Sequence, residues 1–248
     1  MSTARHVDAT RVDEIADGIF RISTPVPATV VPGGFTFNQY LIRDEESLLF
    51  HTGPRMLFAA VHDAIGRVIP RESLRYVSFS HVEADECGSL NQFLAAAPRA
   101  VPLCGQIAAL VSIGDLADRP PRVLADQESL SLGRHTVQWI DAPHLPHGWE
   151  CGFLAETATR TLLCGDLFTQ FGERHPAVTE DDILEPSETA RIGMDYYAHA
   201  PNTGRLLERL ASTAPTTLAC MHGPAWRGDG AALLRSLAVR LAASQTPH

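Results

Sequence analysis

The stretch Leu74-Arg-Tyr-Val-Ser-Phe-Ser-His-Val-Glu-Ala-Asp85 joins an apolar run to a dense group of side chains that can bind metals. The apolar run predicts a buried β-strand over residues 76–79. The polar residues that follow, His81, Glu83 and Asp85, alternate along the chain, so an extended backbone would point all three the same way. Because loops at strand ends carry ligands on a rigid sheet, this stretch predicts a functional site directly after the strand.

Three further candidates follow singly, each after a predicted strand: His147 in Pro143-His-Leu-Pro-His147, Asp166 in Leu163-Cys-Gly-Asp166 and His222 in Cys220-Met-His222. Three imidazoles and three carboxylates are too many ligands for one tetrahedral zinc ion, but they suit two metal ions that share a carboxylate. The alternative to a metal centre is a set of polar loops held together by salt bridges. Because buried, unpaired carboxylates are costly, three converging acids favour a binuclear metal centre.

The composition excludes several classes of function. The 248 residues are 45% hydrophobic, which indicates a folded chain, and no apolar run approaches the roughly 18–20 residues that a membrane span needs. The N-terminus has no hydrophobic signal core, and five cysteines without paired spacing indicate reduced thiols, so we expect a cytoplasmic protein. A net charge of -9 argues against nucleic acid as a partner.

The hydrophobic pattern predicts an α/β fold. In the first half we expect strands at residues 15–23, 38–43, 47–50, 76–79 and 100–103, and helices at 55–68, 86–97 and 106–113. In the second half we expect strands near Val123 and at 129–132, 136–140, 152–156, 161–163 and 216–220, and helices within 187–212 and at 231–243. Strands followed by helices, twice over, predict two packed mixed sheets with helices outside, in one domain over residues 1–248.

The ligand pattern resembles the metallo-β-lactamase fold superfamily, in which such a cluster precedes a His, an Asp and a His on later loops. Glu83 stands where the hydrolases usually carry His, and this resembles the flavodiiron proteins and related oxygen-binding diiron proteins. The spacings agree, with 66, 19 and 56 residues between successive members of His81, His147, Asp166 and His222.

Two other segments resemble the same branch of the superfamily. Tyr196-Tyr-Ala-His199 is similar to the family's Tyr-Tyr-Ala-Asn segment, and Met221-His-Gly-Pro-Ala-Trp226 is similar to its final His-Gly-Pro loop. The resemblance extends over residues 17–241 and implies a four-layer αββα sandwich.

The resemblance also implies a role for each ligand. His81, Glu83 and His147 would bind the first metal, Asp85 and His222 would bind the second, and Asp166 would bridge the two. Replacing an imidazole by Glu83 makes the donor set richer in oxygen, which favours iron or manganese over zinc. Two iron ions are therefore the expected cofactors.

The chain departs from the family pattern at two positions close to the ligands. Glu86 stands where many relatives have a further His, so the second metal either gains a carboxylate or keeps an open position. His51, in His51-Thr-Gly, stands where the superfamily usually has an Asp that supports the site from outside the ligand shell.

Four other residues are weaker candidates. His144 competes with His147 as a ligand, and the 19-residue spacing to Asp166 favours His147. His175 either lines the entrance of the pocket or lies apart from it. Tyr196 and Tyr197 either place a phenol over the metals, as catalytic groups, or belong to the core and the surface.

The resemblance implies a non-haem diiron protein that binds or reduces O2 or NO, or that acts as an oxygen sensor. Only 26 residues follow His222, so we expect no flavodoxin domain in this chain and a separate reductase as the electron donor. A binuclear hydrolase of an ester, lactone or thioester is one alternative, and a non-catalytic gas-sensing module is another. The oligomeric state is open, with a homodimer among the states allowed.

Overall fold

Two seven-stranded sheets form the centre of the computed structural model, which describes residues 9–244. The first sheet has the spatial order β1 (Arg11–Ala16), β2 (Ile19–Val26), β3 (Phe35–Ile42), β4 (Leu48–Phe50), β5 (Tyr76–Ser78), β6 (Val101–Gly105), β7 (Arg122–Leu124). The second has the order β12 (Val178–Thr179), β14 (Ala225–Arg227), β13 (Thr217–Ala219), β11 (Thr161–Leu163), β10 (Gly152–Glu156), β9 (Thr136–Asp141), β8 (Ser129–Ser131).

Both sheets are mixed. In the first, β1 to β4 pair antiparallel, whereas β4, β5, β6 and β7 are parallel neighbours. In the second, β11 is parallel to β13 and β12 to β14, and the remaining pairs are antiparallel. Parallel neighbours need crossover connections, and helices supply several of them on the outer face of each sheet.

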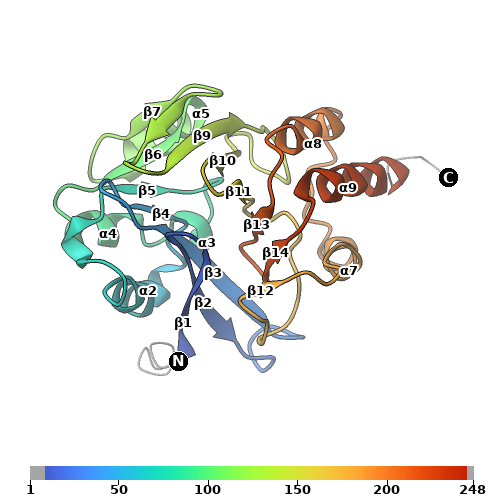
Figure 1. Cartoon of the computed structure of the whole chain (residues 1–248), viewed down its shortest axis with the longest axis horizontal. Helices are drawn as coiled ribbons and strands as arrows, with labels where there is room; N and C mark the ends of the chain where they lie inside the picture. Colours follow the sequence, from blue (N-terminus) through green and yellow to red (C-terminus); the bar gives the residue numbers. More distant parts are fainter. Residues whose placement is uncertain (1–8, 245–248) are drawn as a thin grey trace.

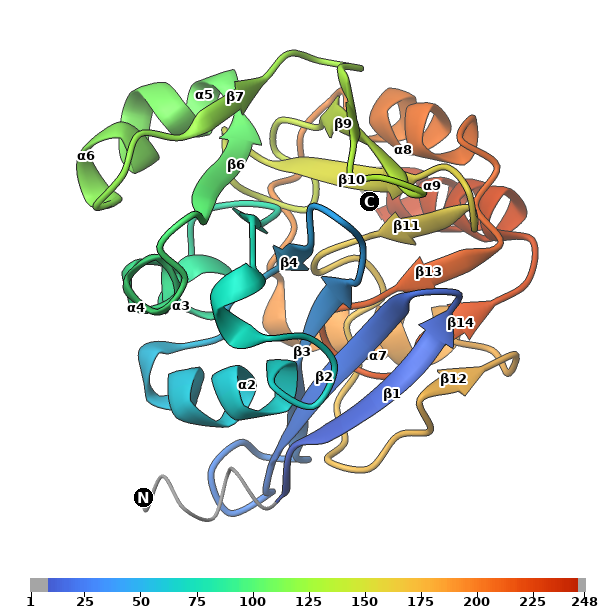
Figure 2. The same ribbon diagram turned by 60° about the vertical axis from the view of Figure 1, so that its left-hand side comes forward.

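The helices form the two outer layers. On the first sheet lie α2 (Phe58–Ile65), α3 (Ala84–Cys87) and α4 (Leu90–Ala96), and on the second lie α7 (Leu184–Met194), α8 (Thr203–Ala211) and α9 (Gly230–Ser244) (Figure 1). The turned view in Figure 2 keeps α2 and α4 on one side of the strands and α8 and α9 on the other. The predicted four-layer αββα sandwich is therefore confirmed.

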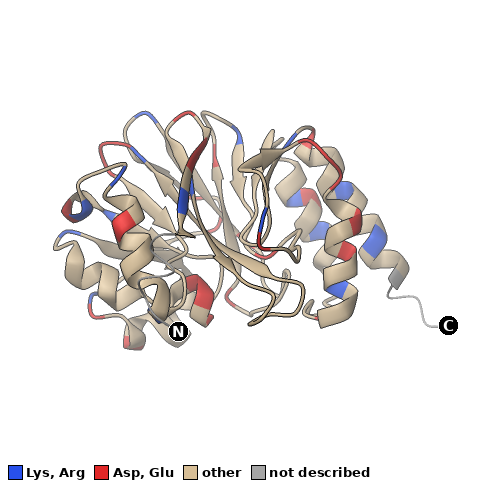
Figure 3. Cartoon of the chain, turned by 90° about the horizontal axis from the view of Figure 1, so that it is seen from below, with Lys and Arg blue, Asp and Glu red and all other residues tan. Residues whose placement is uncertain are grey.

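Short helical segments complete the connections. They are η1 (Arg55–Leu57), η2 (Arg71–Ser73), α5 (Gln106–Ala108), the π-helical η3 (Ala109–Ile113) and α6 (Gly114–Leu116). Figure 3 shows charged residues on the outer helices and the connecting loops, and also on some strands, as with Arg11, Asp13 and Glu14 of β1.

Trp139 of β9 joins the two sheets. Its side chain is fully buried in the core shared by both sheets, and its Nε1 donates to Asp141 Oδ1 at 2.7 Å. A Cβ atom at Gly105 of β6 would lie 2.8 Å from the indole, and one at Gly152 of β10 would lie 2.2 Å from it. The ring therefore fits between the sheets only because glycine occupies both facing positions.

The hairpin at the N-terminal side differs from the single strand expected at residues 15–23. The chain turns at Gly18, whose φ is +69°, and Glu14 Oε1 accepts a hydrogen bond from the Gly18 amide. Asp17-Gly18 between two apolar segments is a typical two-residue hairpin loop, so the sequence does carry a signal for the break between β1 and β2.

Two expected helices also have other boundaries. The helix expected at residues 86–97 is split into α3 and α4, and the one expected at 106–113 continues into α6. The helices expected within 187–212 are α7, which begins slightly earlier at Leu184, and α8. Asp195 ends α7 with a left-handed φ of 49°. The short strands β12 and β14 were not expected.

We propose that the two sheets belong to one domain, because the core around Trp139 draws on both of them. The ends of the expected domain, residues 1–8 and 245–248, lie outside the described residues, and the expectation about a signal core falls on the first of these stretches. Among the described helices, none is both long and apolar enough to cross a membrane. All five cysteines are free thiols.

Gly152→Ala should lower the free energy of unfolding by about 1–3 kcal/mol, because the new methyl group overlaps the Trp139 ring. Gly193→Ala is the matched control: this exposed glycine lies in α7 with no neighbour within 4 Å of a built Cβ, so it should gain up to about 1 kcal/mol. Urea unfolding of both variants measures the difference. Equal stabilities would contradict this account of the sheet interface.

Candidate metal centre

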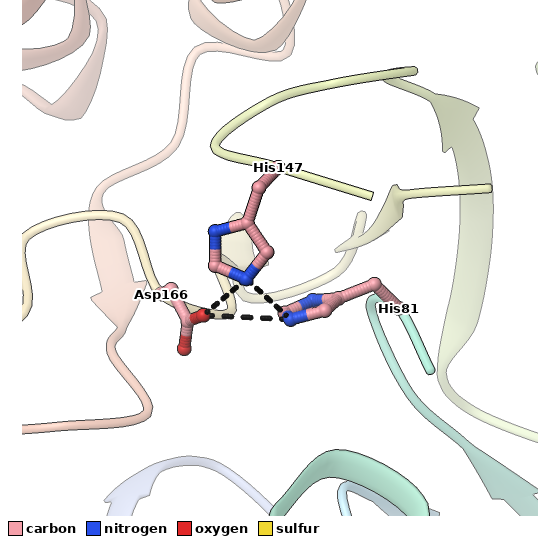
Figure 4. A group of neighbouring side chains, drawn as sticks. All are labelled: His81, His147 and Asp166. Carbon is pink, nitrogen blue, oxygen red and sulfur yellow. Dashed lines mark hydrogen bonds and ion pairs between the residues drawn. The ribbon is translucent and has the colours of Figure 1, made fainter. Parts of the chain in front are cut away.

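The six candidate ligands come together at strand ends of both sheets. His81 follows β5, His147 lies in the loop after β9, Asp166 follows β11 and His222 follows β13. Figure 4 shows His81, His147 and Asp166 pointing toward one another from three different loops. Strand ends of two sheets thus converge on one site, as the positions of the motifs predict.

Glu83 and Asp85 reach the site in a different way from the one expected. The extended backbone ends at Glu83, and α3 begins at Ala84, so Asp85 lies on the first turn of a helix. The simple alternation of side chains after His81 is therefore wrong for Asp85. The helix still turns its carboxylate toward His222, with 3.5 Å between Asp85 Oδ2 and His222 Nε2.

The first group of donors surrounds one oxygen of Asp166. The Nε2 atoms of His81 and His147 are 2.9 Å apart, and each lies 3.5 Å from Asp166 Oδ2. Glu83 Oε1 lies 3.1 Å from His147 Nε2 and 3.9 Å from His81 Nε2. Two imidazoles and two carboxylates thus face a common point.

The second group faces the other oxygen of Asp166. His222 Nε2 lies 3.3 Å from Asp166 Oδ1 and 3.5 Å from Asp85 Oδ2. The two oxygens of Asp166 therefore belong to different groups of donors, which is the arrangement that a carboxylate shared by two cations requires.

Hydrogen bonds on the far side of each imidazole leave its Nε2 atom facing the site. Nδ1 of His222 donates to the carbonyl of Thr36 (2.7 Å), and Nδ1 of His147 donates to the carbonyl of Tyr196 (2.8 Å). Because a carbonyl can only accept, Nδ1 of each ring carries a hydrogen, and Nε2 is the nitrogen that a cation can bind once any proton on it is displaced. Metal-binding histidines in proteins are oriented in this way.

His81 is held through Ser80. The Ser80 amide donates to Nε2 of the buried His51 (3.3 Å), so that nitrogen is an acceptor. Ser80 Oγ lies 3.1 Å from the same atom and 2.9 Å from His81 Nδ1, so its hydroxyl can donate to His51 and accept from His81. Burial lowers the pKa of His51 to about 3, which keeps it neutral. His51, which stands where the superfamily usually has an Asp, is thus linked to His81 through the hydroxyl of Ser80.

The charges of the site depend on one another. Burial would lower the pKa of His222, but the neighbouring carboxylates of Asp166 and Asp85 raise it to about 10. Burial would raise the pKa of Asp166, but the contact with His222 and the charges of His81 and His147 hold it below its usual range. The pKa of the fully buried Glu86 is raised by burial and by the charges of Asp166 and Asp85.

These observations fit a bound pair of cations. Converging carboxylates in a buried place repel one another unless positive charge lies between them. Three imidazoles already turn their Nε2 atoms toward the same place, and three subsets of these side chains have donor atoms within 4.8 Å of one another: His81, His147 and Asp166; His81, Glu83 and Glu86; and Asp85, Glu86 and His222.

The structure places the weaker candidates outside these groups. His144 is exposed, whereas His147 lies within the first group. His175 is half-buried, and its backbone carbonyl accepts a hydrogen bond from Arg11. It belongs to none of the three subsets. Tyr197 is buried in the core beside α7. Tyr196 directs its hydroxyl to the carbonyl of Asp166 at 3.0 Å, so the phenol supports a ligand loop.

Strand β3 and its neighbour β2 hold the loop that carries His222, residues 220–223. Asn38 Nδ2 donates to the carbonyls of Cys220 (2.9 Å) and Gly223 (2.8 Å), Arg21 donates to Gly223, and Tyr40 donates to Cys220 at 2.6 Å. These buried polar residues were not among the predicted site residues. Their only signal is a polar side chain inside an apolar strand.

Two phenylalanine rings contact the imidazole of His222. Phe35 stacks on it with 4.2 Å between ring centroids, and Phe37 meets it edge-on at 5.6 Å. These rings, also missed, give the second group an apolar border.

The architecture and the site define the metallo-β-lactamase fold. The family model described as "ODP family beta lactamase" matches residues 35–223, which is more than half of the chain. The chain therefore belongs to this family, and the resemblance expected from its motifs is confirmed.

Two curated relatives illustrate the likeness. The rubredoxin-oxygen oxidoreductase of Megalodesulfovibrio gigas is 29% identical over 213 residues, which cover 81% of this chain and 51% of that protein. The anaerobic nitric oxide reductase flavorubredoxin of Klebsiella pneumoniae is 25% identical over 208 residues, covering 79% and 42%. The chain thus spans about half, or less, of the length of these relatives.

Solved structures of related proteins show the same likeness. The rubredoxin oxygen:oxidoreductase of Desulfovibrio gigas matches with a TM-score of 0.81 and 25% identity, over 96% of this chain and 63% of that one. The flavodiiron core of Flv1 from Synechocystis sp. PCC6803 matches with a TM-score of 0.78 and 21% identity, over 95% and 61%. The expected likeness to the core of flavodiiron proteins is confirmed.

Tyr40→Phe should lower the free energy of unfolding by about 0.5–1.5 kcal/mol, because it removes the hydrogen bond to the carbonyl of Cys220. Tyr76→Phe serves as the control: its ring is also buried, but no bond from its hydroxyl is seen among the described residues, so its change should stay within about 0.5 kcal/mol. Urea unfolding compares the two. A larger effect at Tyr76 would refute the role given to Tyr40.

His147→Ala should weaken metal binding, because it removes a donor that faces Asp166, whereas His144→Ala should keep the metal content of the parent protein. Asp166→Ala should lose both ions or retain one loosely. Elemental analysis after anaerobic purification gives the stoichiometry of each variant. Metal content that follows His144 instead would show that the wrong histidine was assigned.

Proposed function

We propose that the protein is a non-haem diiron protein that binds or reduces O2 or NO, with electrons from a separate partner protein. The observation that carries this proposal is the position of Asp166, whose two oxygens face two different groups of imidazoles and carboxylates. The proposed ligands are His81, Glu83 and His147 for the first ion, Asp85 and His222 for the second, and Asp166 for both.

The donor set supports iron. Half of the six proposed ligands are carboxylates, and oxygen-rich sets favour iron or manganese over zinc. Two ferrous ions would supply the electrons that a bound diatomic gas accepts. The names of the relatives, a rubredoxin-oxygen oxidoreductase and a nitric oxide reductase, agree with this chemistry.

The side chains of the chain provide the surroundings for that reaction. The carbonyls of Thr36 and Tyr196 fix two imidazoles, and Ser80 fixes the third. The stacked ring of Phe35 covers one face of the His222 imidazole and excludes water from it. Reduced iron suits a reducing compartment, so we propose a cytoplasmic location, which the five free thiols support.

Iron-loaded protein, reduced under anaerobic conditions, should change its absorption spectrum on mixing with O2 or NO in a stopped-flow instrument. With a supplied reductant, it should consume O2 in an oxygen electrode, while the zinc-loaded protein should not, because zinc does not change its oxidation state. Glu83→His should shift the preference toward zinc, since it replaces a carboxylate by an imidazole.

The same preparations distinguish the hydrolase alternative. Esters, lactones and thioesters should be turned over slowly or not at all by the zinc and iron forms. Efficient hydrolysis by the protein as purified, together with no reaction of its reduced form with either gas, would overturn the proposed function and leave the fold intact.

A further inference from the structure

Glu86 lies at the centre of the donor groups although its neighbours on the chain are partly exposed. Its side chain is buried, whereas the side chains of Asp85 and Glu83 are 24% and 52% exposed. Helix α3 turns it inward, and the amide of Thr52 donates to its backbone carbonyl at 2.8 Å. The helix and this hydrogen bond therefore hold the backbone from which the carboxylate extends into the site.

The carboxylate of Glu86 receives no hydrogen bond from its surroundings. Within residues 9–244, no N–H or hydroxyl group forms a hydrogen bond with either of its oxygens. A carboxylate oxygen of Asp85 lies within 4.8 Å of a Glu86 oxygen, so the alternative to a bound cation is a proton shared by these two carboxyl groups. A buried carboxylate without donors is costly, so its surroundings require positive charge.

Glu86 points into the site from between the two groups. Its Oε1 lies 3.8 Å from His81 Nε2. Glu86 also belongs both to the subset with His81 and Glu83 and to the subset with Asp85 and His222, whose donor atoms lie within 4.8 Å of one another. No other described carboxylate of the site outside the six proposed ligands occupies such a place in these subsets.

We propose that Glu86 is a further ligand of the second metal ion, beside Asp85 and His222. This inference rests on the proposed binuclear centre. The first ion would have His81, Glu83, His147 and Asp166 as donors from the chain, whereas the second, without Glu86, would have Asp85, His222 and Asp166. Glu86 supplies a fourth donor to the second ion, so that each of the two ions has four donors from the chain.

The added carboxylate also changes the charge of the centre. Asp166, Glu83, Asp85 and Glu86 together contribute −4, which two divalent ions balance without any further anion. A neutral set tolerates burial, whereas three carboxylates would leave one positive charge. The fourth carboxylate makes the donors harder, so Glu86 adds to the selection of iron or manganese against zinc.

The variant Glu86→Gln distinguishes two roles for Glu86: a ligand of the metal ion, or a side chain that only shares a proton with Asp85. The amide has nearly the same shape and can donate to Asp85, so a hydrogen bond between the two side chains is kept. The amide loses the charge and is a weak donor to a cation. If Glu86 only shared a proton with Asp85, the variant should bind metals as the parent protein does.

The experiment is a titration of the metal-free protein with Mn2+, in which electron paramagnetic resonance measures the free ion. The parent protein should bind two ions per chain. Glu86→Gln should keep the first and bind the second at least about 10-fold more weakly. Glu150→Gln is the matched control: Glu150 Oε1 accepts from the Val82 amide at 2.9 Å, a bond that an amide oxygen preserves, so both ions should be kept.

Circular dichroism of the metal-free variants checks that each is folded. Unchanged affinity for both Mn2+ ions in Glu86→Gln would overturn the assignment, and so would loss of both ions in a folded variant, since Glu86 would then serve the whole centre. A parent protein that binds two Mn2+ ions but whose iron form ignores O2 and NO would refute the gas chemistry alone. A parent protein that binds fewer than two would refute both proposals.

Discussion

Hydrogen bonds from the first sheet to the carbonyl groups of residues 220–223 hold the two halves of the site in register. Asn38 and Tyr40 of β3 and Arg21 of β2 make these bonds, and all three side chains are buried. His222 belongs to the second sheet, yet its Nδ1 donates to Thr36 of the first. Without these contacts the imidazole of His222 would have no fixed relation to Asp85, which lies on α3 beside the first sheet.

The layers and the meeting of the six candidate side chains could be predicted because both depend on local patterns. Apolar runs of strand length mark the strands, and polar residues such as Asp166 and His222 stand directly after them. Strand ends gather at the edges of sheets, so side chains far apart in sequence come together there. That these side chains bind metal stays a prediction.

The remaining features depend on contacts that a linear pattern does not contain. The helical position of Asp85 follows from the start of α3 at Ala84. The turn at Gly18 is different, because the pair Asp17-Gly18 is a hairpin signal that the linear pattern does contain. The pairing of Asn38 with the carbonyls of another sheet is visible only when both sheets are placed. Glu86 could be identified from the sequence as a departure from the family pattern, but its burial and its lack of donors could not.

The division of the proposed ligands between the two sheets affects how readily the protein is degraded. His81, Glu83 and Asp85 follow a strand of the first sheet, whereas His147, Asp166 and His222 follow strands of the second. Ions bound between them would act as a non-covalent cross-link, so the free energy of binding would also oppose separation of the sheets. Under the proposed function, iron supply would then govern resistance to proteolysis, and chains made during iron starvation would be degraded sooner than loaded ones.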